Sequence, residues 1–383
     1  MAALLVILLA ALGYTYAGYA LLLAVLWRVR PRRVVRKGPI EPRVSLVIPA
    51  YNEERAIRGK LDNVTSLTFP RERLQVVVVS DASTDRTDAI VAGYTQRGVE
   101  LERLATRRGK IGAYAAVFPR LTGDIVVFSD ATSMVVPDAL DRLVENFADP
   151  SVGCVGAQVR FVNPSDAAVG KGVNTYWDYE SAIKQRESDL DSLVSVSGTL
   201  YAVRRDLYPL DMREDLADDL IVPLDVRARG LRAVFEPAAI CVEETTLDVR
   251  EEVAKRTRIT IQNIRGLVSR AAMFNPIRFG LFSLFLVSHK LMRLLVPALL
   301  ILVFVLTAAL AVSSPLFVVL AVLQLAFYVS AIAVYFLESH ARVRALNAVF
   351  YFCLSNLAIL LGMVSFFKGT RVATWETLRR PEP

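Results

Sequence analysis

The longest apolar stretches of this chain lie near its two ends. One covers residues 2–27, and three more cover about 291–312, 316–337 and 345–367. Each has about the 20 residues that an α-helix needs to cross a bilayer. We therefore expect a membrane helix over 1–27 and about three more over 289–368, followed by a tail at 369–383. A shorter apolar run, 277–287, is expected to lie in the membrane interface with amphipathic helices over 251–288.

The middle of the chain has a different pattern, in which short β-branched runs alternate with polar, helix-like segments from 43 to 250. Three runs, at 44–48, 74–79 and 124–128, are apolar at all but one position each, which is typical of parallel strands covered on both faces. We expect an α/β domain with a mostly parallel sheet and helices on both faces.

Polar and acidic side chains follow each of these runs, and the carboxyl edge of a parallel sheet is where ligands bind. The residues are Tyr51 and Glu53 after the first run, Asp81 and Asp85 after the second, and Asp130 after the third. We expect them to meet in one crevice, although each acid could instead cap a helix.

The basic residues argue for a membrane rather than for nucleic acid. The net charge is +7, but the cations cluster beside apolar runs, at 28–37 and 265–278. Such juxtamembrane clusters mark the cytoplasmic side. We expect an integral protein of the plasma (inner) membrane, a basic linker over 28–42 and a cytoplasmic central domain. No nucleic-acid-binding motif is present.

Few residues are available for metal or triad chemistry. The three cysteines, Cys154, Cys241 and Cys353, have no CxxC spacing, which disfavours zinc and a disulfide framework. Only two histidines exist, both beside membrane runs, so a Ser-His-Asp triad is excluded. Acid-base chemistry must therefore rest on carboxylates.

Four carboxylates gather just before an apolar run that ends at Gly230. They are Glu214, Asp215, Asp218 and Asp219. Neighbouring carboxylates raise each other's pKa, which makes this cluster a candidate general base. A solvated first helical turn, favoured by the helix dipole, is the alternative.

Two further features have both a structural and a functional interpretation. Lys110, in a Gly-Lys turn, could lie against phosphates, although no GxGxxG or P-loop sequence is present. Trp177, in an aromatic segment of helical character, could belong to the core or could stack on a sugar.

Several motifs occur in the order found in one enzyme family. They are Pro49-Ala-Tyr-Asn-Glu53, Ser80-Asp-Ala-Ser-Thr-Asp85, Gly109-Lys110, Phe128-Ser-Asp-Ala131, Gly198-Thr-Leu-Tyr-Ala-Val-Arg204 and Asp218-Asp219. The region 43–270 thus resembles membrane-integrated family 2 glycosyltransferases, the group of hyaluronan, cellulose, chitin and poly-N-acetylglucosamine synthases. The resemblance implies a GT-A fold and inverting transfer from a nucleotide sugar, with UDP as the expected nucleotide, to a glycan or lipid-linked acceptor.

The resemblance also implies roles for single residues. Counting back eleven residues from Gly230 selects Asp219 as the base, with Asp218 beside it. Tyr51, Glu53, Asp81 and Lys110 would bind the nucleotide. Asp130 matches the first acid of an Asp-x-Asp motif and would bind nucleotide and Mg²⁺ or Mn²⁺.

Two positions depart from the family pattern. Thr132 replaces the second acid of the metal motif, which puts the metal ligand set in doubt. Gln262 and Arg265 match a Gln-x-x-Arg-Trp motif that would hold the diphosphate or acceptor, but Gly266 replaces its Trp. Trp177 is a second candidate for the acceptor, and processive or single addition stays open.

The alternatives are a polyprenyl-phosphate sugar synthase and, outside the enzymes, a scaffold or transporter subunit with a nucleotide-sensing domain. The side of the membrane on which the C-terminal tail lies is also open. Three successive spans would place it outside, whereas Lys368 and Arg371 favour the cytoplasm, and one run could fail to cross.

Overall fold

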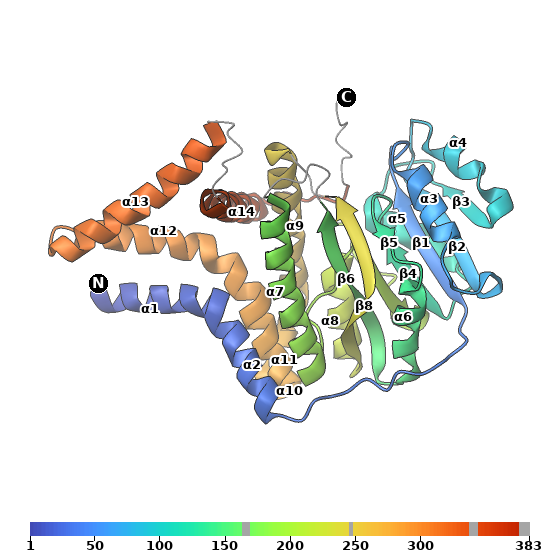
Figure 1. The fold of residues 1–383 in the computed structure, drawn as a ribbon, viewed down its shortest axis with the longest axis horizontal. Helices are drawn as coiled ribbons and strands as arrows, with labels where there is room; N and C mark the ends of the chain where they lie inside the picture. The colour runs from blue at the N-terminus through green and yellow to red at the C-terminus, as the bar shows by residue number, and fades with distance from the viewer. Residues whose placement is uncertain (163–168, 245–247, 337–343, 375–383) are drawn as a thin grey trace.

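The computed structural model describes residues 1–162, 169–244, 248–336 and 344–374. Its centre is an eight-stranded sheet in the order β3-β2-β1-β4-β7-β6-β8-β5 (Figure 1). The strands are β1 (Val44–Ala50), β2 (Leu74–Ser80), β3 (Val99–Arg103), β4 (Ile125–Ser129), β5 (Met134–Val135), β6 (Val152–Val162), β7 (Leu200–Arg204) and β8 (Arg232–Glu244).

The sheet is mixed. Strands β1, β2, β3 and β4 are parallel to one another, as the apolar runs at β1, β2 and β4 predict, whereas β7 lies antiparallel between β4 and β6. The predicted α/β fold with helices on both faces is confirmed.

Helices cover both faces of the sheet and give it two cores. One face packs on α3 (Ile57–Thr65), α4 (Thr87–Ala92) and α6 (Ala139–Glu145). The other packs on α5 (Gly109–Val117) and α8 (Asp218–Ala228). Because β1 alternates its side chains between these cores, every residue of the strand is buried.

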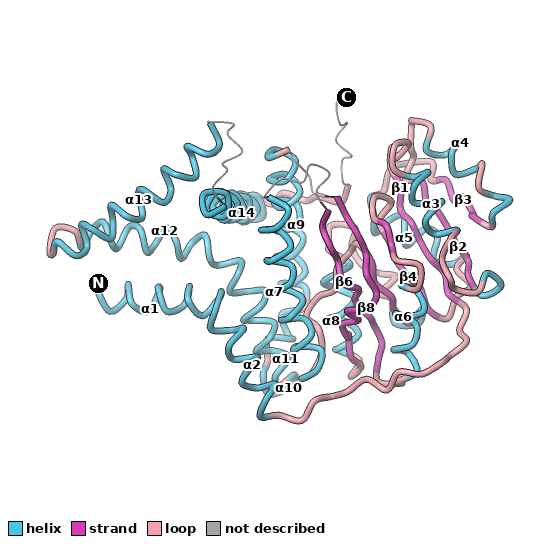
Figure 2. Tube along the Cα trace, in the orientation of Figure 1, coloured by secondary structure: helices cyan, strands magenta, loops and turns pink. Residues whose placement is uncertain are grey.

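A third core joins the sheet domain to the apolar helices. It includes Tyr19 and Leu23 of α2 (Tyr19–Val29), Ile183 of α7 (Val169–Leu190), Leu220 of α8 and Phe285 of α11 (Leu281–Phe285). The chain from α2 to β1 runs as an extended loop past one end of the sheet (Figure 2).

Within the described part of the chain, four helical segments are long and apolar enough to cross a membrane: Ala2–Val29, Leu281–Leu310, Pro315–Phe336 and Ala345–Phe367. The first joins α1 (Ala2–Gly13) to α2 through a π-turn. The third is α13 (Pro315–Phe336), and the last lies in α14 (Arg344–Phe367).

The interfacial position expected for 277–287 stays a prediction, and the structure gives the helices that this run forms. A short helix, α10 (Pro276–Phe279), ends at Gly280, whose φ of 58° lies in the left-handed region. From Leu281 the chain runs on through α11, a π-helical stretch (Leu286–Leu291) and α12 (Met292–Leu310) as one segment of 30 residues.

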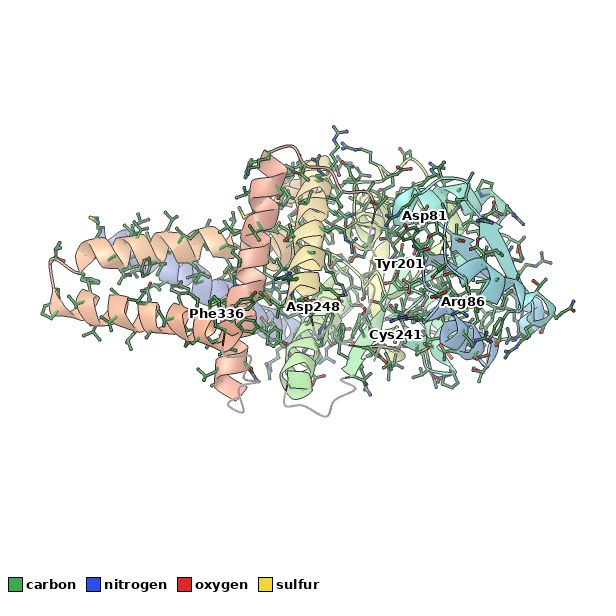
Figure 3. All side chains as sticks on the ribbon, turned by 90° about the horizontal axis from the view of Figure 1, so that it is seen from above. Asp81, Arg86, Tyr201, Cys241, Asp248 and Phe336 are labelled. Atoms are coloured by element: carbon green, nitrogen blue, oxygen red, sulfur yellow. The ribbon has the colours of Figure 1, made fainter. Side chains whose placement is uncertain are left out.

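Helix α14 takes a direction of its own. It is seen nearly end-on where α12 and α13 run across the view (Figure 1), and it crosses their direction when the molecule is turned (Figure 3). It packs on α9 (Val249–Ser269), where a Cβ at Gly362 would lie 2.6 Å from Cβ of Thr260. By length and hydropathy α14 is a candidate span, although its direction differs from that of α12 and α13.

Candidate functional site

The loops after β1 and β2 interlock through backbone donors. The N–H groups of Asn52, Glu53 and Glu54 donate to side chains of the second loop, at 3.2 Å, 2.8 Å and 3.1 Å. Their acceptors are Ser83 Oγ, Thr87 Oγ1 and Asp85 Oδ2. The polar residues that follow these strands thus form one edge, as the sequence predicts.

Asp81 organises the start of α5. Its carboxylate is fully buried and accepts the N–H groups of Arg108 at 2.7 Å and Gly109 at 2.8 Å. A carboxylate at a helix N-terminus satisfies donors that have no partner within the helix. Contact between Asp81 and a nucleotide stays a prediction. At the same edge, the Arg107 guanidinium lies 3.7 Å from the centre of the Tyr51 ring.

Lys110 links α5 to two other elements. Its ammonium donates to Asp130 Oδ1 at 2.9 Å and to the Gly198 carbonyl at 3.0 Å. Burial lowers the pKa of Lys110, but the charges of Asp130 and Asp218 outweigh this and raise it well above its usual value. Lys110 is therefore a fixed cation.

Gly198 lies between Lys110 and the acid pair. A Cβ there would lie 3.4 Å from Lys110 Nζ and 3.7 Å from Asp219 Oδ2. The segment before β7 is held in place because the Val196 N–H donates to the Asp219 carbonyl at 2.9 Å. The nucleotide-side residues and the acid pair thus belong to one site.

The two acids of the pair differ in environment. Asp218 is buried, and Tyr201 donates its hydroxyl to Asp218 Oδ2 at 2.7 Å. Asp219 is half-buried. Burial and the charge of Asp218 raise the pKa of Asp219, while the charges of Lys290, Lys110 and Lys184 lower it in part. Asp219 is therefore the acid of this pair that a substrate can reach.

An aromatic cluster packs around the tyrosine that binds Asp218. Phe128 contacts Tyr114, Tyr201 and Tyr208, with ring centres 4.3–5.0 Å apart. All four rings are buried. This cluster fixes the Tyr201 hydroxyl and, through it, the start of α8.

Gln262 and Arg265 do not face an empty crevice. Gln262 Nε2 donates to the Val372 carbonyl at 3.2 Å, and Arg265 Nη2 donates to the Thr370 carbonyl at 2.7 Å. The tail then passes over the start of α5, because a Cβ at Gly109 would lie 2.1 Å from the Ala373 carbonyl oxygen. Their diphosphate role stays a prediction.

Sequence reasoning missed Arg258, which lies one helical turn before Gln262 on α9. Burial lowers its pKa, and the charges of Asp130, Asp219 and Asp218 oppose that effect. Arg258 therefore lies near enough to these acids for their charges to act on it. No motif marks this arginine; the i, i+4 spacing from Gln262 was the available signal.

The replacement of the motif Trp by Gly266 has a packing reason. A Cβ at 266 would lie 2.9 Å from Leu220 Cδ2 and 3.4 Å from Ile221 Cδ1, so α9 approaches α8 too closely for a larger residue. The other candidate for the acceptor, Trp177, lies on α7. Its ring centre is 4.9 Å from that of Phe161 and 5.8 Å from Lys184 Nζ.

Asp130 is suited to a divalent metal whose other ligands are mainly substrate phosphates and waters. Within the described ranges no three His, Cys, Asp or Glu side chains gather at a metal-binding distance. Asp130 is partly exposed, and Thr132 is exposed. Mg²⁺ commonly binds one or two carboxylates, substrate phosphates and waters, which this donor set fits.

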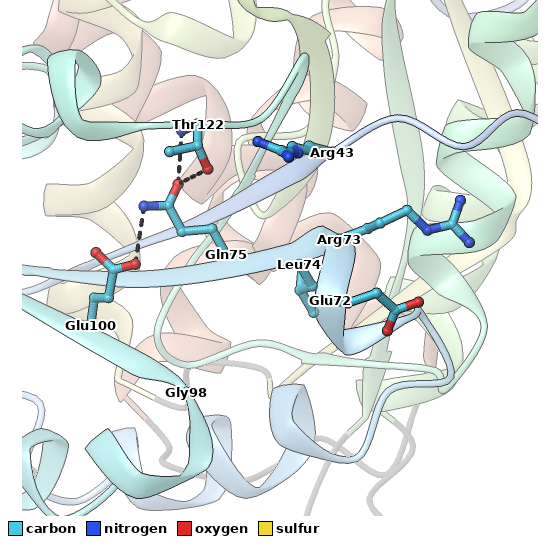
Figure 4. Close-up of a pocket in the computed structure, with 8 residues that line it drawn as sticks. All are labelled: Arg43, Glu72, Arg73, Leu74, Gln75, Gly98, Glu100 and Thr122. Carbon is cyan, nitrogen blue, oxygen red and sulfur yellow. Dashed lines mark hydrogen bonds between the residues drawn. The ribbon is translucent and has the colours of Figure 1, made fainter.

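A pocket of about 250 Å³ lies at the opposite edge of the sheet (Figure 4). It is lined by residues at the amino ends of β2 and β3, where Gln75 bonds to Glu100 at 3.1 Å and accepts the Thr122 N–H at 2.9 Å. This pocket lies at the amino edge of the sheet, whereas the acids lie at the carboxyl edge, so it is not part of their site.

Comparison with known proteins identifies the class of the central domain. Residues 45–209 match the family described as "Glycosyl transferase family 2". The chain is 27% identical to "Probable glycosyltransferase YdaM" of Bacillus subtilis over 259 residues, 64% of this chain and 62% of that protein. It is 25% identical to "Poly-beta-1,6-N-acetyl-D-glucosamine synthase" of Staphylococcus aureus over 209 residues, 52% of this chain and 49% of that protein. The chain thus spans less than two thirds of these curated relatives.

One solved structure is similar along nearly the whole chain. It is "Mannosyltransferase PcManGT from Pyrobaculum calidifontis in complex with GDP-Man and Mn2+", with 26% identity and a TM-score of 0.73. The similarity covers 96% of this chain and 100% of that one. The predicted resemblance, GT-A fold and enzyme class are confirmed, and the scaffold and transporter alternatives lose their support.

Proposed function

Because residues 45–209 match glycosyl transferase family 2, we propose that this chain moves a sugar from a nucleoside diphosphate sugar to a hydroxyl of a glycan or glycolipid, with inversion at the sugar carbon. The observation that carries this proposal is the half-buried carboxylate of Asp219, set beside the Lys110–Asp130 ion pair at the carboxyl edge of the sheet.

Asp219 serves as the general base. The acceptor O–H gives its proton to this carboxylate while the oxygen forms a bond to the anomeric carbon. The bond between that carbon and the phosphate oxygen breaks, and its electron pair leaves on the nucleoside diphosphate. The pKa of Asp219, raised by burial, makes it a stronger base than an exposed aspartate.

The cations of the site stabilise the leaving group. Lys110, fixed by Asp130 and the Gly198 carbonyl, and Arg258, which lies near the acids, lie on the side where negative charge develops. Asp130 would hold Mg²⁺ or Mn²⁺, which supplies positive charge to the diphosphate. Asp81 keeps Lys110 in place through the backbone of Arg108 and Gly109.

We assign the remaining predicted residues to the two substrates. Tyr51 and Glu53 would bind the nucleotide, and Trp177, which packs on Phe161, would stack on the acceptor sugar. Gln262 and Arg265 reach the diphosphate only when the tail releases them. The similar mannosyltransferase structure contains GDP-Man, so the donor test includes GDP-sugars as well as the expected UDP-sugars.

We place the sheet domain in the cytoplasm and the apolar helices in the plasma (inner) membrane. The basic linker after α2 carries the cations expected on the cytoplasmic side. The chain crosses the membrane at α1–α2, at α11–α12 and at α13, while α14 lies along the surface. This arrangement returns the tail to the side of the sheet domain and removes the conflict with Lys368 and Arg371.

The test uses purified protein in nanodiscs, a panel of UDP- and GDP-sugars, Mn²⁺ and lipid-linked acceptors. Products are identified by mass, and nucleoside diphosphate release is measured. Asp219→Asn should lower transfer by about 100-fold to 10,000-fold, the usual contribution of a general base. The exposed Asp211→Asn should retain activity. Release from no donor would overturn the proposal.

The runner-up remains transfer to a polyprenyl phosphate, whose oxygen is already ionised and needs no general base. Full activity of Asp219→Asn on that acceptor alone would favour it.

A further inference from the structure

Lys60 of α3 is a lysine whose side chain has no exposure to solvent. Its ammonium lies at the carboxyl end of β4, where it donates to Ser129 Oγ at 2.7 Å, to the Ser133 carbonyl at 2.7 Å and to Ser133 Oγ at 3.3 Å. Burying an ammonium is costly, and these hydrogen bonds offset part of the cost. The proposed reaction does not use this group, so its retention in the core has another reason.

The two serines are the ends of the turn that carries Asp130. Ser129 is the last residue of β4, Asp130 follows it, and Ser133 comes just before β5. One ammonium therefore holds both ends of this turn. Lys60 lies on the buried side of the turn, whereas the Asp130 side chain is 34% exposed.

The serine hydroxyls extend these bonds to the backbone of Asp130. Ser133 Oγ donates to the Asp130 carbonyl at 2.9 Å. Ser129 Oγ donates to the Thr199 carbonyl at 3.3 Å, and the same carbonyl accepts the Asp130 N–H at 3.2 Å. Both backbone polar groups of Asp130 thus belong to the hydrogen-bond network that surrounds the Lys60 ammonium.

The network also reaches Lys110. Thr199 follows Gly198, whose carbonyl accepts Lys110 Nζ at 3.0 Å, and Asp130 Oδ1 accepts the same ammonium at 2.9 Å. Both acceptors of Lys110 are therefore attached to segments that the Lys60 network holds. A shift of the turn would move the Asp130–Lys110 ion pair.

Asp130 is the one acid of this turn, because position 132 is Thr. A divalent cation held by Asp130 would contact the turn through a single carboxylate and could not fix the distance between its ends. The shape of the turn must therefore come from the protein. Groups behind a metal ligand that orient it in this way contribute about 10–100-fold to metal affinity or activity.

We propose that Lys60 is a positioning residue of the donor site, whose ammonium fixes the turn from Ser129 to Ser133 so that Asp130 meets the diphosphate and its divalent cation. The inference rests on the proposed glycosyl transfer and adds a residue to the donor site. Because Lys60 is fully buried, it touches no substrate and acts through Asp130.

The experiment measures binding of UDP and of GDP, each with Mn²⁺, by titration calorimetry of the protein in nanodiscs. The KM values of donor and acceptor are measured in parallel. Lys60→Met retains the length of the side chain and removes its three donors. It should weaken binding of the nucleoside diphosphate that the wild type prefers by about 10–100-fold and raise the donor KM, while the acceptor KM stays unchanged.

Asn63→Ala is the matched control. Asn63 lies nearly one turn after Lys60 on α3 and exchanges two hydrogen bonds of 2.9 Å with the backbone of Val135, two residues beyond the turn. Its loss disturbs the packing of α3 on the same segment but leaves the Lys60 network intact. Asn63→Ala should therefore bind the nucleoside diphosphate as the wild type does. Thermal unfolding reports the stability of both variants.

Ser133→Ala tests the same network by a smaller change, and it serves if Lys60→Met does not fold. It removes the hydroxyl between Lys60 and the Asp130 carbonyl and should weaken binding in the same direction, by a smaller factor. In the Lys60→Met background its effect should be smaller still, because residues of one network do not act additively.

Three results would overturn the inference. Lys60→Met, or Ser133→Ala in its place, could bind the nucleoside diphosphate as tightly as the wild type. Asn63→Ala could weaken binding as much as Lys60→Met, or the loss could fall on the acceptor KM instead of the donor KM. In each case the wild type still binds its donor and transfers sugar, which separates this failure from failure of the proposed function.

Discussion

Arg265 donates a hydrogen bond from Nη2 to the carbonyl oxygen of Thr370 at 2.7 Å. An arginine that the family resemblance assigns to the diphosphate therefore holds the C-terminal tail. The same tail reaches Gly109 three residues later, where its backbone lies in the space that a Cβ would need. A diphosphate that approaches Lys110 and Arg265 must displace residues 369–374.

Donor binding should therefore loosen the tail. We expect a nucleoside diphosphate sugar with Mn²⁺ to increase amide hydrogen exchange across 369–374, measured by mass spectrometry. Arg265→Gln should produce the same increase without donor, since it removes the bond to Thr370. An unchanged tail in both samples would show that it does not cover the donor site.

The acid limb of the pH profile should report Asp219. Because burial and Asp218 raise the pKa of this base above 3.8, activity should be lost at a higher pH than for an exposed aspartate. Asp218→Asn removes a charge that raises this pKa and should move the limb to lower pH. Lys184→Gln removes a charge that lowers it and should move the limb to higher pH. Both shifts are read from kcat/KM against pH, and shifts of the opposite sign would contradict the assignment.

Restoring the family residue at 266 should harm the protein. Gly266→Trp places a ring where Leu220 and Ile221 already pack, and overpacking of this kind costs about 1–3 kcal/mol or more. Thermal unfolding in detergent measures the loss. Gly266→Ala should cost less, because the nearest atom is the end of the flexible Leu220 side chain. Equal stability of Gly266→Trp and the wild type would mean that α9 and α8 can separate.

The number of membrane-spanning segments can be tested by thiol labelling of intact cells, with Cys353→Ser as the background variant. Ser313→Cys, in the turn between α12 and α13, should react with an impermeant maleimide from outside. Thr370→Cys should react only after the cytoplasmic side is opened. Labelling of both positions from outside would restore α14 as a fourth span.

The buried network around His289 should be important for stability. His289→Leu leaves Glu180 and Glu187 buried with fewer partners, and breaking such a pair costs about 3–5 kcal/mol. His289→Gln, which can still donate to one carboxylate, should lose less. Denaturant unfolding in detergent measures both, and a His289→Leu protein as stable as the wild type would show that water reaches the carboxylates.

The strands and their acidic ends could be predicted because both signals are local. A run such as Val76–Val79 is apolar at every position only when both faces are covered, and Asp81 follows it at the edge where ligands bind. The choice of Asp219 over Asp218 came from the family spacing. In the structure the Tyr201 hydroxyl donates a hydrogen bond to the Asp218 carboxylate, whereas Asp219 is half-buried and stays accessible.

Other features could not be predicted because they depend on contacts between distant segments. Hydropathy shows that α14 is apolar but not that it runs across its neighbours. Lys184 in a polar helix carries no motif, and its effect on the pKa of Asp219 follows only from the folded arrangement. At position 266 the sequence shows only that the family Trp is absent. The structure shows that α9 and α8 approach each other closely at this glycine.

The free thiols of the sheet domain offer a way to follow its unfolding. Cys154 lies in the core under α5 and α8, and Cys241 lies in the core under α3 and α6, so the two sulfur atoms are sealed on opposite faces of one sheet. Burial raises the pKa of Cys241 to about 11, which further slows its alkylation while the fold is intact. The two alkylation rates would therefore tell which layer of helices lifts away first.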